Sequence, residues 1–168
     1  MLTRSGYIIE GTAEIKKELT VRPEVNGDFG FPPPPFKVFR KSKNGICVPR
    51  FYGTAKVGEP ATDKRPEPAR ANLRFNGTLR DATHQNAALA AALKAGHGVL
   101  SLPCGYGKTT VALAIACKLG YRTMIVVHKE FLAAQWEERI RQFCPGASIG
   151  RVQQNKKETE CDFIIAML

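Results

Sequence analysis

The chain has 168 residues, of which 43% are hydrophobic, so it can form one domain or two small ones with a buried core. Lys and Arg number 25 against 15 Asp and Glu, and the net charge of +10 suggests a nucleic-acid partner, with a merely soluble basic surface as the alternative. No apolar run approaches the roughly 20 residues that span a bilayer, and the first residues lack a signal-peptide segment, so we expect no membrane partner.

The cysteines argue against a disulfide scaffold and against a zinc site. They number five, they are scattered, no two of them form a CxxC motif, and the three histidines do not complete a zinc spacing. We therefore expect reduced thiols in an intracellular protein.

The first 80 residues predict a small β-rich domain of the α+β class. Tyr7 to Ile9 is a short strand, and Ala13 to Leu19 is a short helix that the Thr12 side chain can cap. Residues 30–36 hold four prolines, which predict a stiff polyproline II connector, with a binding segment for an SH3-like partner as the alternative.

Residues 37–52 predict a hairpin, because Asn44-Gly45 supplies the positive φ angles of a tight turn. Basic and aromatic residues alternate along it, with no acidic residue among them. This mixture suits a nucleic-acid-binding face, while aromatic residues on alternating strand positions are also typical of a core. The basic residues are Lys37, Arg40, Lys41, Lys43 and Arg50, and the aromatic residues are Phe36, Phe39, Phe51 and Tyr52.

A change of character near residue 80 predicts a domain boundary. Residues 58–70 are rich in proline and charge and predict a linker, and Leu73 to Leu79 predicts one more short strand. We assign residues 1–80 to an accessory domain and residues 81–168 to a second domain. The first region carries 15 basic and 8 acidic residues and the second 10 and 7, so most of the positive charge lies in the first.

From residue 81 on, strands and helices alternate, which predicts an α/β fold with a parallel sheet and helices on both of its faces. Three helices are predicted. The first helix is capped by Thr83, runs through Ala87 to Leu93 and ends at Gly96. The second helix covers Val111 to Cys117 and ends at Gly120. The third helix covers Lys129 to Phe143 and has one apolar face, formed by Leu132, Trp136, Ile140 and Phe143. The predicted strands are Gly98 to Leu100, Thr123 to Val127, Ser148 to Val152 and Phe163 to Ala166.

Between the strand at 98–100 and the helix at 111–117 lies a glycine-rich loop that ends in Gly-x-Gly-Lys-Thr. Strand, glycine-rich turn, Lys-Thr and helix together are the layout of a P-loop, although Leu102 occupies the position of the motif's first glycine. Glycines let the backbone curl so that its N–H groups face phosphate oxygens, and the following helix adds its positive end. The alternative is a Gly/Lys loop without a ligand.

This pattern predicts a site for ATP and Mg²⁺. Lys108 is expected to reach the β- and γ-phosphates and the Thr109 hydroxyl to bind Mg²⁺, so these two are the candidate catalytic residues. The residues predicted to surround the nucleotide are Pro103, Cys104, Gly105, Tyr106, Gly107, Lys108, Thr109 and Thr110.

Residues 80–168 resemble the first RecA-like motor domain of superfamily 2 helicases, of the XPB-like and restriction-motor type. The resemblance rests on four segments: Arg80 to Gln85, the loop PCGYGKT at 103–109, VVHKEFLAAQW at 126–136, and the strands IGRV at 149–152 and DFIIA at 162–166. It implies a P-loop NTPase sheet in which Gln85 binds the adenine edge, although one extra residue separates Arg80 from Gln85. It also implies nucleic-acid contacts from His128, Lys129 and Arg151, and His128 stands where such motors often have proline.

The segments GYIIE, FKVFR, VPRFYG, LPCGYGKT and VVHKEFL further resemble helicases of large nucleocytoplasmic DNA viruses. This resemblance implies a DNA partner more than an RNA partner, and a place near transcription or replication machinery. For a viral protein it implies the nucleus, a cytoplasmic viral factory or the virion.

The family's acidic motif, Asp-Glu-x-His or Asp-Glu-x-Asp, has no counterpart, because no Asp-Glu pair occurs in the sequence. The expected RecA-like sheet is therefore incomplete, and the chain is expected to be a fragment of a larger motor or a truncated protein that is inactive by itself. The expected parent activity is that of an ATP-dependent DNA helicase or translocase. The alternatives are an RNA helicase, a restriction or remodelling translocase, and a non-catalytic module that binds nucleotide and DNA.

Overall fold

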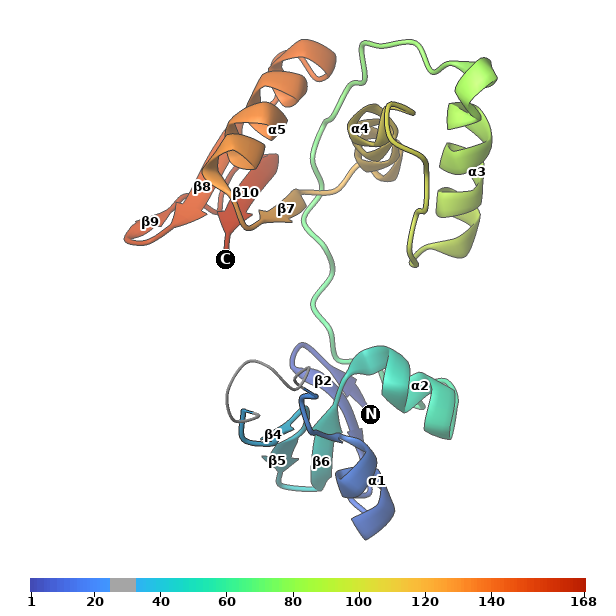
Figure 1. The fold of residues 1–168 in the computed structure, drawn as a ribbon, viewed down its shortest axis with the longest axis vertical. Helices are drawn as coiled ribbons and strands as arrows, with labels where there is room; N and C mark the ends of the chain where they lie inside the picture. Colours follow the sequence, from blue (N-terminus) through green and yellow to red (C-terminus); the bar gives the residue numbers. More distant parts are fainter. Residues whose placement is uncertain (25–32) are drawn as a thin grey trace. The chain divides into compact units, whose positions relative to one another are not determined.

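The computed structural model describes residues 1–24 and 33–168, which divide into two compact units, Met1–Glu67 and Pro68–Leu168 (Figure 1). Residues 68–80, which we assigned to the first domain, thus group with the second unit. No helix in the described part of the chain is long and apolar enough to cross a membrane.

The first unit is an antiparallel sheet flanked by two helices. Its four strands pair in the order β1-β2-β6-β5, and β3 and β4 form a separate antiparallel pair. The elements are β1 (Leu2–Thr3), β2 (Gly6–Ile9), α1 (Ala13–Glu18), β3 (Thr20–Val21), β4 (Phe36–Lys37), β5 (Arg40–Ser42), β6 (Gly45–Val48) and α2 (Arg50–Val57). The predicted β-rich α+β architecture is found.

Apolar residues on one face of this sheet, together with Leu19 at the end of α1, form the first core. The core contains Leu2, Tyr7, Ile9, Leu19, Ile46 and Val48. The predicted cap of α1 is confirmed, because the Thr12 hydroxyl accepts a hydrogen bond from the Ile15 backbone N–H. Glu18 joins the two helices, since its carboxylate accepts from the Tyr52 hydroxyl at 2.6 Å and from Lys56 at 2.9 Å.

The predicted hairpin is real but shorter than expected. β5 and β6 pair around a turn at Lys43-Asn44, not at Asn44-Gly45: Gly45 has the predicted positive φ but already lies in β6, and Asn44 does not have one. Arg50 to Tyr52, which fell within the predicted hairpin, form the start of α2. Pro49 explains the change, because proline cannot donate to a strand ladder but is tolerated at a helix start. The polyproline prediction falls in part on residues 30–32, which lie outside the described residues.

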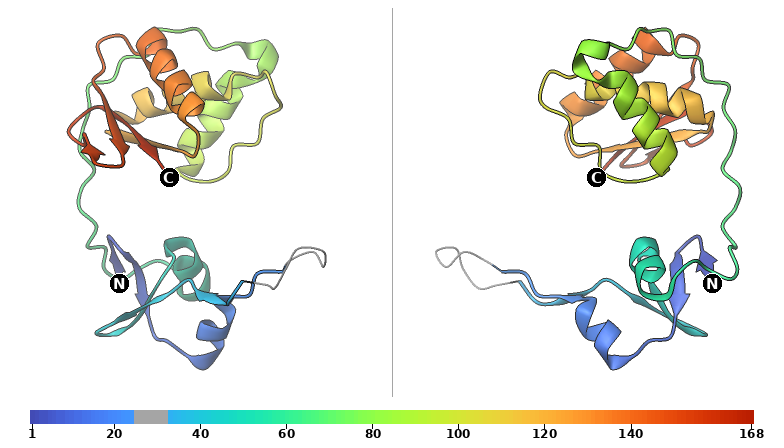
Figure 2. Two further views of the ribbon diagram at one scale, coloured as in Figure 1. Left: turned by 60° about the vertical axis from the view of Figure 1, so that its left-hand side comes forward. Right: turned by 90° about the vertical axis from the view of Figure 1, so that its right-hand side faces the viewer.

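The second unit holds a four-stranded sheet in the order β7-β10-β8-β9, in which β10 pairs parallel with both β7 and β8. Figure 2 shows α3 beside α4 in both views. The elements are η1 (Asp81–Thr83), α3 (Gln85–Ala95), α4 (Lys108–Leu119), β7 (Thr123–Val127), α5 (Glu130–Phe143), β8 (Ile149–Gln153), β9 (Lys156–Lys157) and β10 (Phe163–Met167). The predicted parallel pairing and the helix ends at Gly96 and Gly120, both with positive φ, are confirmed.

One face of this sheet carries the second core. α4 and α5 pack against it, and α5 contributes the face predicted from its periodicity. On β7, however, the opposite face carries Met124 and Val126, which are 56% and 53% exposed. The prediction of helices on both faces is therefore wrong for β7 in the described part of the chain.

Two predicted strands are absent. Residues 98–100 are irregular, and Val99 is 97% exposed. The segment has no ladder partner among the described residues and hence no backbone pairing to hold it extended.

Leu73 to Leu79, the other predicted strand, is irregular too, although Leu73 and Phe75 pack against the second core. The Asn76 N–H donates to the Phe143 carbonyl, and the rings of Phe75 and Phe143 stack with centroids 5.8 Å apart. Here apolar residues anchor an irregular segment to a helix end.

Candidate functional site

The glycine-rich loop leads directly into α4, which begins at Lys108. Gly105 and Gly107 have φ angles of +80° and +74°, in the left-handed region that the sequence predicted for a curled loop. No side chain caps α4, so its first backbone N–H groups face outward at the positive end of the helix dipole. Such a helix start is suited to an anion.

Lys108 lies over the loop that precedes it. Its ammonium donates to the backbone carbonyls of Leu102 and Pro103, at 3.0 Å each. The side chain is exposed, and both of its partners are neutral oxygens. Phosphate oxygens accept stronger, charge-assisted hydrogen bonds, so an incoming phosphate can replace the carbonyls. The sequence did not predict the role of the Leu102 carbonyl, because a backbone acceptor leaves no signal in residue type.

Gln85 braces the loop from α3. Its side chain is 1% exposed, its amide oxygen accepts from the Arg80 N–H, and its amide nitrogen donates to the Tyr106 carbonyl, both at 2.8 Å. The structure thus brings Gln85 to the predicted loop, although the protein itself uses both ends of its amide. The helix cap predicted at Thr83 is wrong: His84, with a φ of 53°, is the N-cap of α3, and the Thr83 hydroxyl donates to the Arg80 carbonyl.

Replacing Gly107 with Ala is expected to destabilise the second unit by at least about 2 kcal/mol. The φ angle of +74° is strained for alanine, and its Cβ would lie 2.5 Å from the Gln85 amide nitrogen. Gly105→Ala is the matched control, because Gly105 has a similar φ and nothing within 4 Å, so it should cost only about 1 kcal/mol. Denaturant unfolding of the two variants measures the difference, and equal losses would contradict the bracing contact.

The remaining predicted nucleotide contacts surround the start of α4. Pro103, Cys104 and Gly105 are exposed, while Tyr106, Thr109 and Thr110 are half-buried. The Thr109 hydroxyl is a hard oxygen donor, as Mg²⁺ prefers. Residues 1–24 and 33–168 contain no group of three or more His, Cys, Asp or Glu side chains that could hold a metal ion. The Thr109 hydroxyl is thus chemically suited to be a Mg²⁺ ligand, and this role stays a prediction.

The residues predicted to contact nucleic acid differ in exposure and in ion pairing. His128 and Lys129 are exposed at the carboxyl end of β7, and Lys129 is the N-cap of α5. Arg151 on β8 instead bonds two carboxylates of α5: its guanidinium lies 2.7 Å from Glu137 and 2.7 Å from Glu130. The hydrogen bond from Arg151 lowers the pKa of Glu130. Hydrogen bonds from Arg141 and then Arg151 lower the pKa of Glu137. The role of Arg151 toward nucleic acid stays a prediction, and its ion pairs join β8 to α5.

Arg151→Ala is expected to lower the midpoint of thermal unfolding by about 2–5 °C at pH 7, since partly exposed ion pairs contribute little each. The folded-state pKa values of Glu130 and Glu137 lie below 4.5, so this contribution is present above pH 4.5 and is lost as the pH falls through the lowered values. Thermal unfolding of both proteins from pH 7 to pH 3 measures it. Arg139→Ala, on the same helix as the two carboxylates, is the control and should show a smaller change, and a pH-independent difference would contradict the ion pairs.

Comparisons with known proteins identify the family of the second unit. The family described as "Type III restriction enzyme, res subunit" matches residues 78–168. A protein of Acanthamoeba polyphaga mimivirus named "Putative ATP-dependent RNA helicase" is 35% identical over 99% of this chain and 35% of its own length. A "Putative helicase" of Invertebrate iridescent virus 3 is 38% identical over 70% of this chain and 40% of its own. The "DNA 3'-5' translocase XPB2" of Sulfurisphaera tokodaii is 39% identical over 52% of this chain and 19% of its own.

The chain spans about 35–40% of the length of the two viral relatives. The family match covers more than half of the chain, from just before Arg80 through Gln85, the glycine-rich loop, α4 and β10. The mixed α/β architecture, with its parallel strands, is consistent with a partial RecA-like domain. The chain therefore belongs to the type III restriction enzyme res subunit family within the superfamily 2 helicases, and it is of the kind found in large nucleocytoplasmic DNA viruses.

Proposed function

We propose that this chain carries the nucleotide-binding part of an ATP-dependent DNA helicase or translocase. The observation that carries the proposal is the position of Lys108, whose ammonium lies over the glycine-rich loop at the uncapped start of α4. The ammonium, the first backbone N–H groups of α4 and the positive end of its dipole therefore all lie at the same place, where each attracts an anion. That combination favours the β- and γ-phosphates of a nucleoside triphosphate.

Each further residue of the loop has a proposed task. Gln85 holds the loop in shape through the Tyr106 carbonyl, and its predicted contact with adenine requires that its amide exchange a partner. Mg²⁺, when bound to Thr109 and the phosphates, offsets the negative charge between the phosphoryl groups. Lys108 and Thr109 therefore orient the phosphates, whereas the chain supplies no Asp-Glu pair to position an attacking water.

Nucleic acid is the proposed track of the motor. In the second unit, His128 and Lys129 are exposed after β7, and in the first unit the basic residues of the hairpin are exposed. DNA is proposed over RNA because two relatives are named for DNA: the translocase of Sulfurisphaera tokodaii and a "DNA 3'-5' helicase XPB" of Mycobacterium tuberculosis, which is 34% identical over 61% of this chain. The mimivirus relative is named as an RNA helicase. By the same analogy to viral relatives, transcription or replication machinery in the nucleus, a viral factory or the virion is the proposed setting.

A titration with a fluorescent ATP analogue, with and without Mg²⁺, tests the nucleotide site. We expect saturable binding that ATP and ADP displace and AMP does not, because the loop contacts the phosphates beyond the first one. Displacement by AMP with the same affinity would place recognition on the nucleoside and remove the loop from the site.

A polypeptide of these 168 residues is expected to bind ATP at best weakly and to release phosphate no faster than the uncatalysed reaction. It has no Asp-Glu pair to position Mg²⁺ and the attacking water, and positioning of these groups carries most of the catalysis of phosphoryl transfer. Asp162 does not replace the pair, because it lies at the amino end of β10 and its carboxylate accepts from Ser148. A phosphate-release assay measures this, and robust turnover would indicate another kind of P-loop enzyme.

A further inference from the structure

Two cysteines from different helices meet at the edge of the second core. Cys117 lies in the last turn of α4 and Cys144 is the C-cap of α5. Their sulfur atoms are 3.5 Å apart, although 27 positions separate them in the sequence. Both are free thiols. A disulfide bond is about 2.05 Å long, so a shift of about 1.5 Å joins them.

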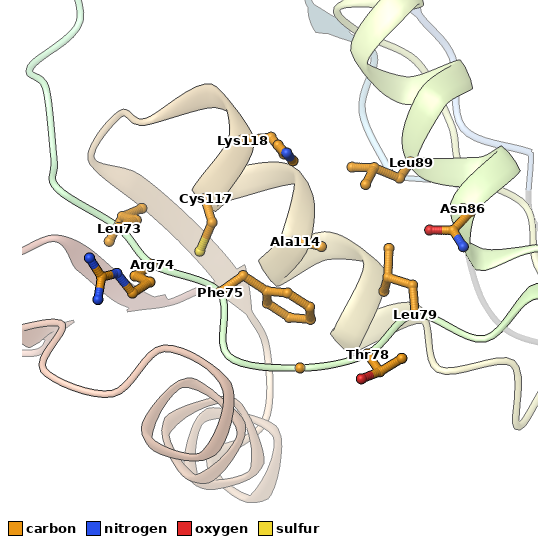
Figure 3. A pocket seen from close by; sticks show the side chains of 11 residues that line it. Leu73, Arg74, Phe75, Thr78, Leu79, Asn86, Leu89, Ala114, Cys117 and Lys118 are labelled. Atoms are coloured by element: carbon orange, nitrogen blue, oxygen red, sulfur yellow. The ribbon is translucent and has the colours of Figure 1, made fainter.

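A cavity gives solutes access to one member of the pair. It has a volume of about 600 Å³ and lies between α3, α4 and residues 73–79 (Figure 3). The Cys117 side chain lines it, on the side of Leu73 and Phe75 (Figure 3). Cys117 is half-buried, whereas Cys144 is 1% exposed. A small reagent therefore reaches the sulfur of Cys117 first.

The contact between the two thiols also makes them chemically unequal. Either sulfur can donate in this contact, but Cys144 is the more buried of the two, and burial disfavours a thiolate there. The contact with Cys144 lowers the pKa of Cys117. The same bond, together with burial, raises the pKa of Cys144. Since the thiolate is the reactive form of cysteine, Cys117 is both the more accessible and the more readily ionised sulfur.

We propose that Cys117 and Cys144 form a redox-active dithiol that hydrogen peroxide converts into a disulfide between α4 and α5. The Cys117 thiolate attacks one peroxide oxygen, the O–O bond breaks, and the leaving hydroxide takes a proton to become water. The Cys144 sulfur then attacks the resulting sulfenic acid, loses its proton, and displaces a second hydroxide as water. In sum, two thiols are oxidised and one peroxide is reduced to two waters, and a dithiol reductant reverses the change.

The disulfide would close a loop that contains β7 and the whole of α5. A cross-link of that length restricts the unfolded chain, so the oxidised second unit should unfold about 5 °C or more above the reduced one. The bond lies at the end of α4 opposite to Lys108. The disulfide proposal does not depend on nucleotide binding, so an experiment can contradict the disulfide without contradicting the nucleotide site, and the reverse.

Peroxide treatment of the full chain, followed by blocking of free thiols and tryptic mass mapping, tests the proposal. We expect peptides 109–118 and 142–151 to appear joined, with two hydrogen atoms lost, and to separate after reduction. The thermal midpoint should rise on oxidation and return on reduction. Cys104, which is exposed, reports the general reactivity of thiols in the same sample. Oxidation of Cys104 while both Cys117 and Cys144 remain free would overturn the proposal.

Single substitutions test the order of the steps. Cys144→Ser should leave a sulfenic acid on Cys117 that dimedone traps, whereas Cys117→Ser should leave Cys144 as a thiol. Cys161→Ser, which removes another half-buried cysteine of the same unit, should leave the disulfide and its thermal shift unchanged. Dimedone labelling of Cys144 in the Cys117→Ser protein, at the rate seen for Cys117, would contradict the assigned order. The mapping of the unsubstituted chain decides the proposal even if a variant fails to fold.

Discussion

Replacing Lys108 with Ala is expected to lower the affinity for Mg²⁺-ATP by about 10- to 100-fold. The ammonium is the cation that the loop holds at the start of α4, with Leu102 and Pro103 as its present partners. A hydrogen bond to a charged group contributes about 1.5–3 kcal/mol, and about 1.4 kcal/mol corresponds to tenfold in affinity. Titration of both proteins with the fluorescent ATP analogue measures the loss.

Two controls separate a site effect from a fold effect. Lys118→Ala removes the same charge from the other end of α4, where the side chain is exposed, and should leave the affinity within about twofold. The thermal midpoint of Lys108→Ala should match that of the unsubstituted chain, because the carbonyls of Leu102 and Pro103 can bond water once the exposed ammonium is gone. Equal nucleotide affinities for Lys108→Ala and the unsubstituted chain would remove Lys108 from the site.

Raising the salt concentration from 50 to 200 mM is expected to weaken binding to single-stranded nucleic acid by about 100-fold. Each phosphate contact contributes a slope of about −0.7 on a log–log plot, and five contacts, one for each basic residue of the predicted hairpin region at 37–52, give that loss. Four of the five residues lie on or beside β4 and β5 and one begins α2, and all of them are exposed. Affinity should hardly depend on base sequence, because backbone contacts carry no sequence information.

Removal of two charges from the hairpin tests where these contacts lie. Lys41→Ala with Lys43→Ala should reduce the magnitude of the slope by about 1.4. Lys16→Ala with Lys17→Ala removes the same charge from α1 in the same unit and should leave the slope unchanged. Fluorescence anisotropy at four salt concentrations gives each slope. A flat response, or affinity that follows base sequence, would argue against a motor track.

Much of the second unit follows from signals that lie close together in the sequence. The apolar run at 123–127 forms β7, the spacing of Leu132, Trp136 and Ile140 forms the inner face of α5, and glycines end α3 and α4. These predictions hold because a helix or a buried strand is recognisable from the period of its own apolar residues, and because positive φ angles favour glycine.

Partners distant in the sequence account for the predictions that were wrong. The apolar run at 98–100 has strand propensity, yet it forms no strand, because a strand needs a neighbour that its own residues cannot supply. Leu73 and Phe75 have the same propensity and instead pack on the core from an irregular segment. Propensity states what a segment can form, and pairing settles whether it does so.

The candidate site divides in the same way. The Gly-x-Gly-Lys-Thr motif located the loop, because its glycines reflect a backbone that curls, as the positive φ angles of Gly105 and Gly107 show. The contact of its lysine with phosphate stays a proposal. Three contacts could be found only in the tertiary structure. The buried amide of Gln85 bonds the loop next to Gly107, the Arg151 guanidinium bonds two carboxylates of α5, and the sulfur of Cys144 lies beside that of Cys117. Each of these contacts joins residues 14 to 27 positions apart, and only packing of α3, α4, α5 and β8 brings them within bonding distance.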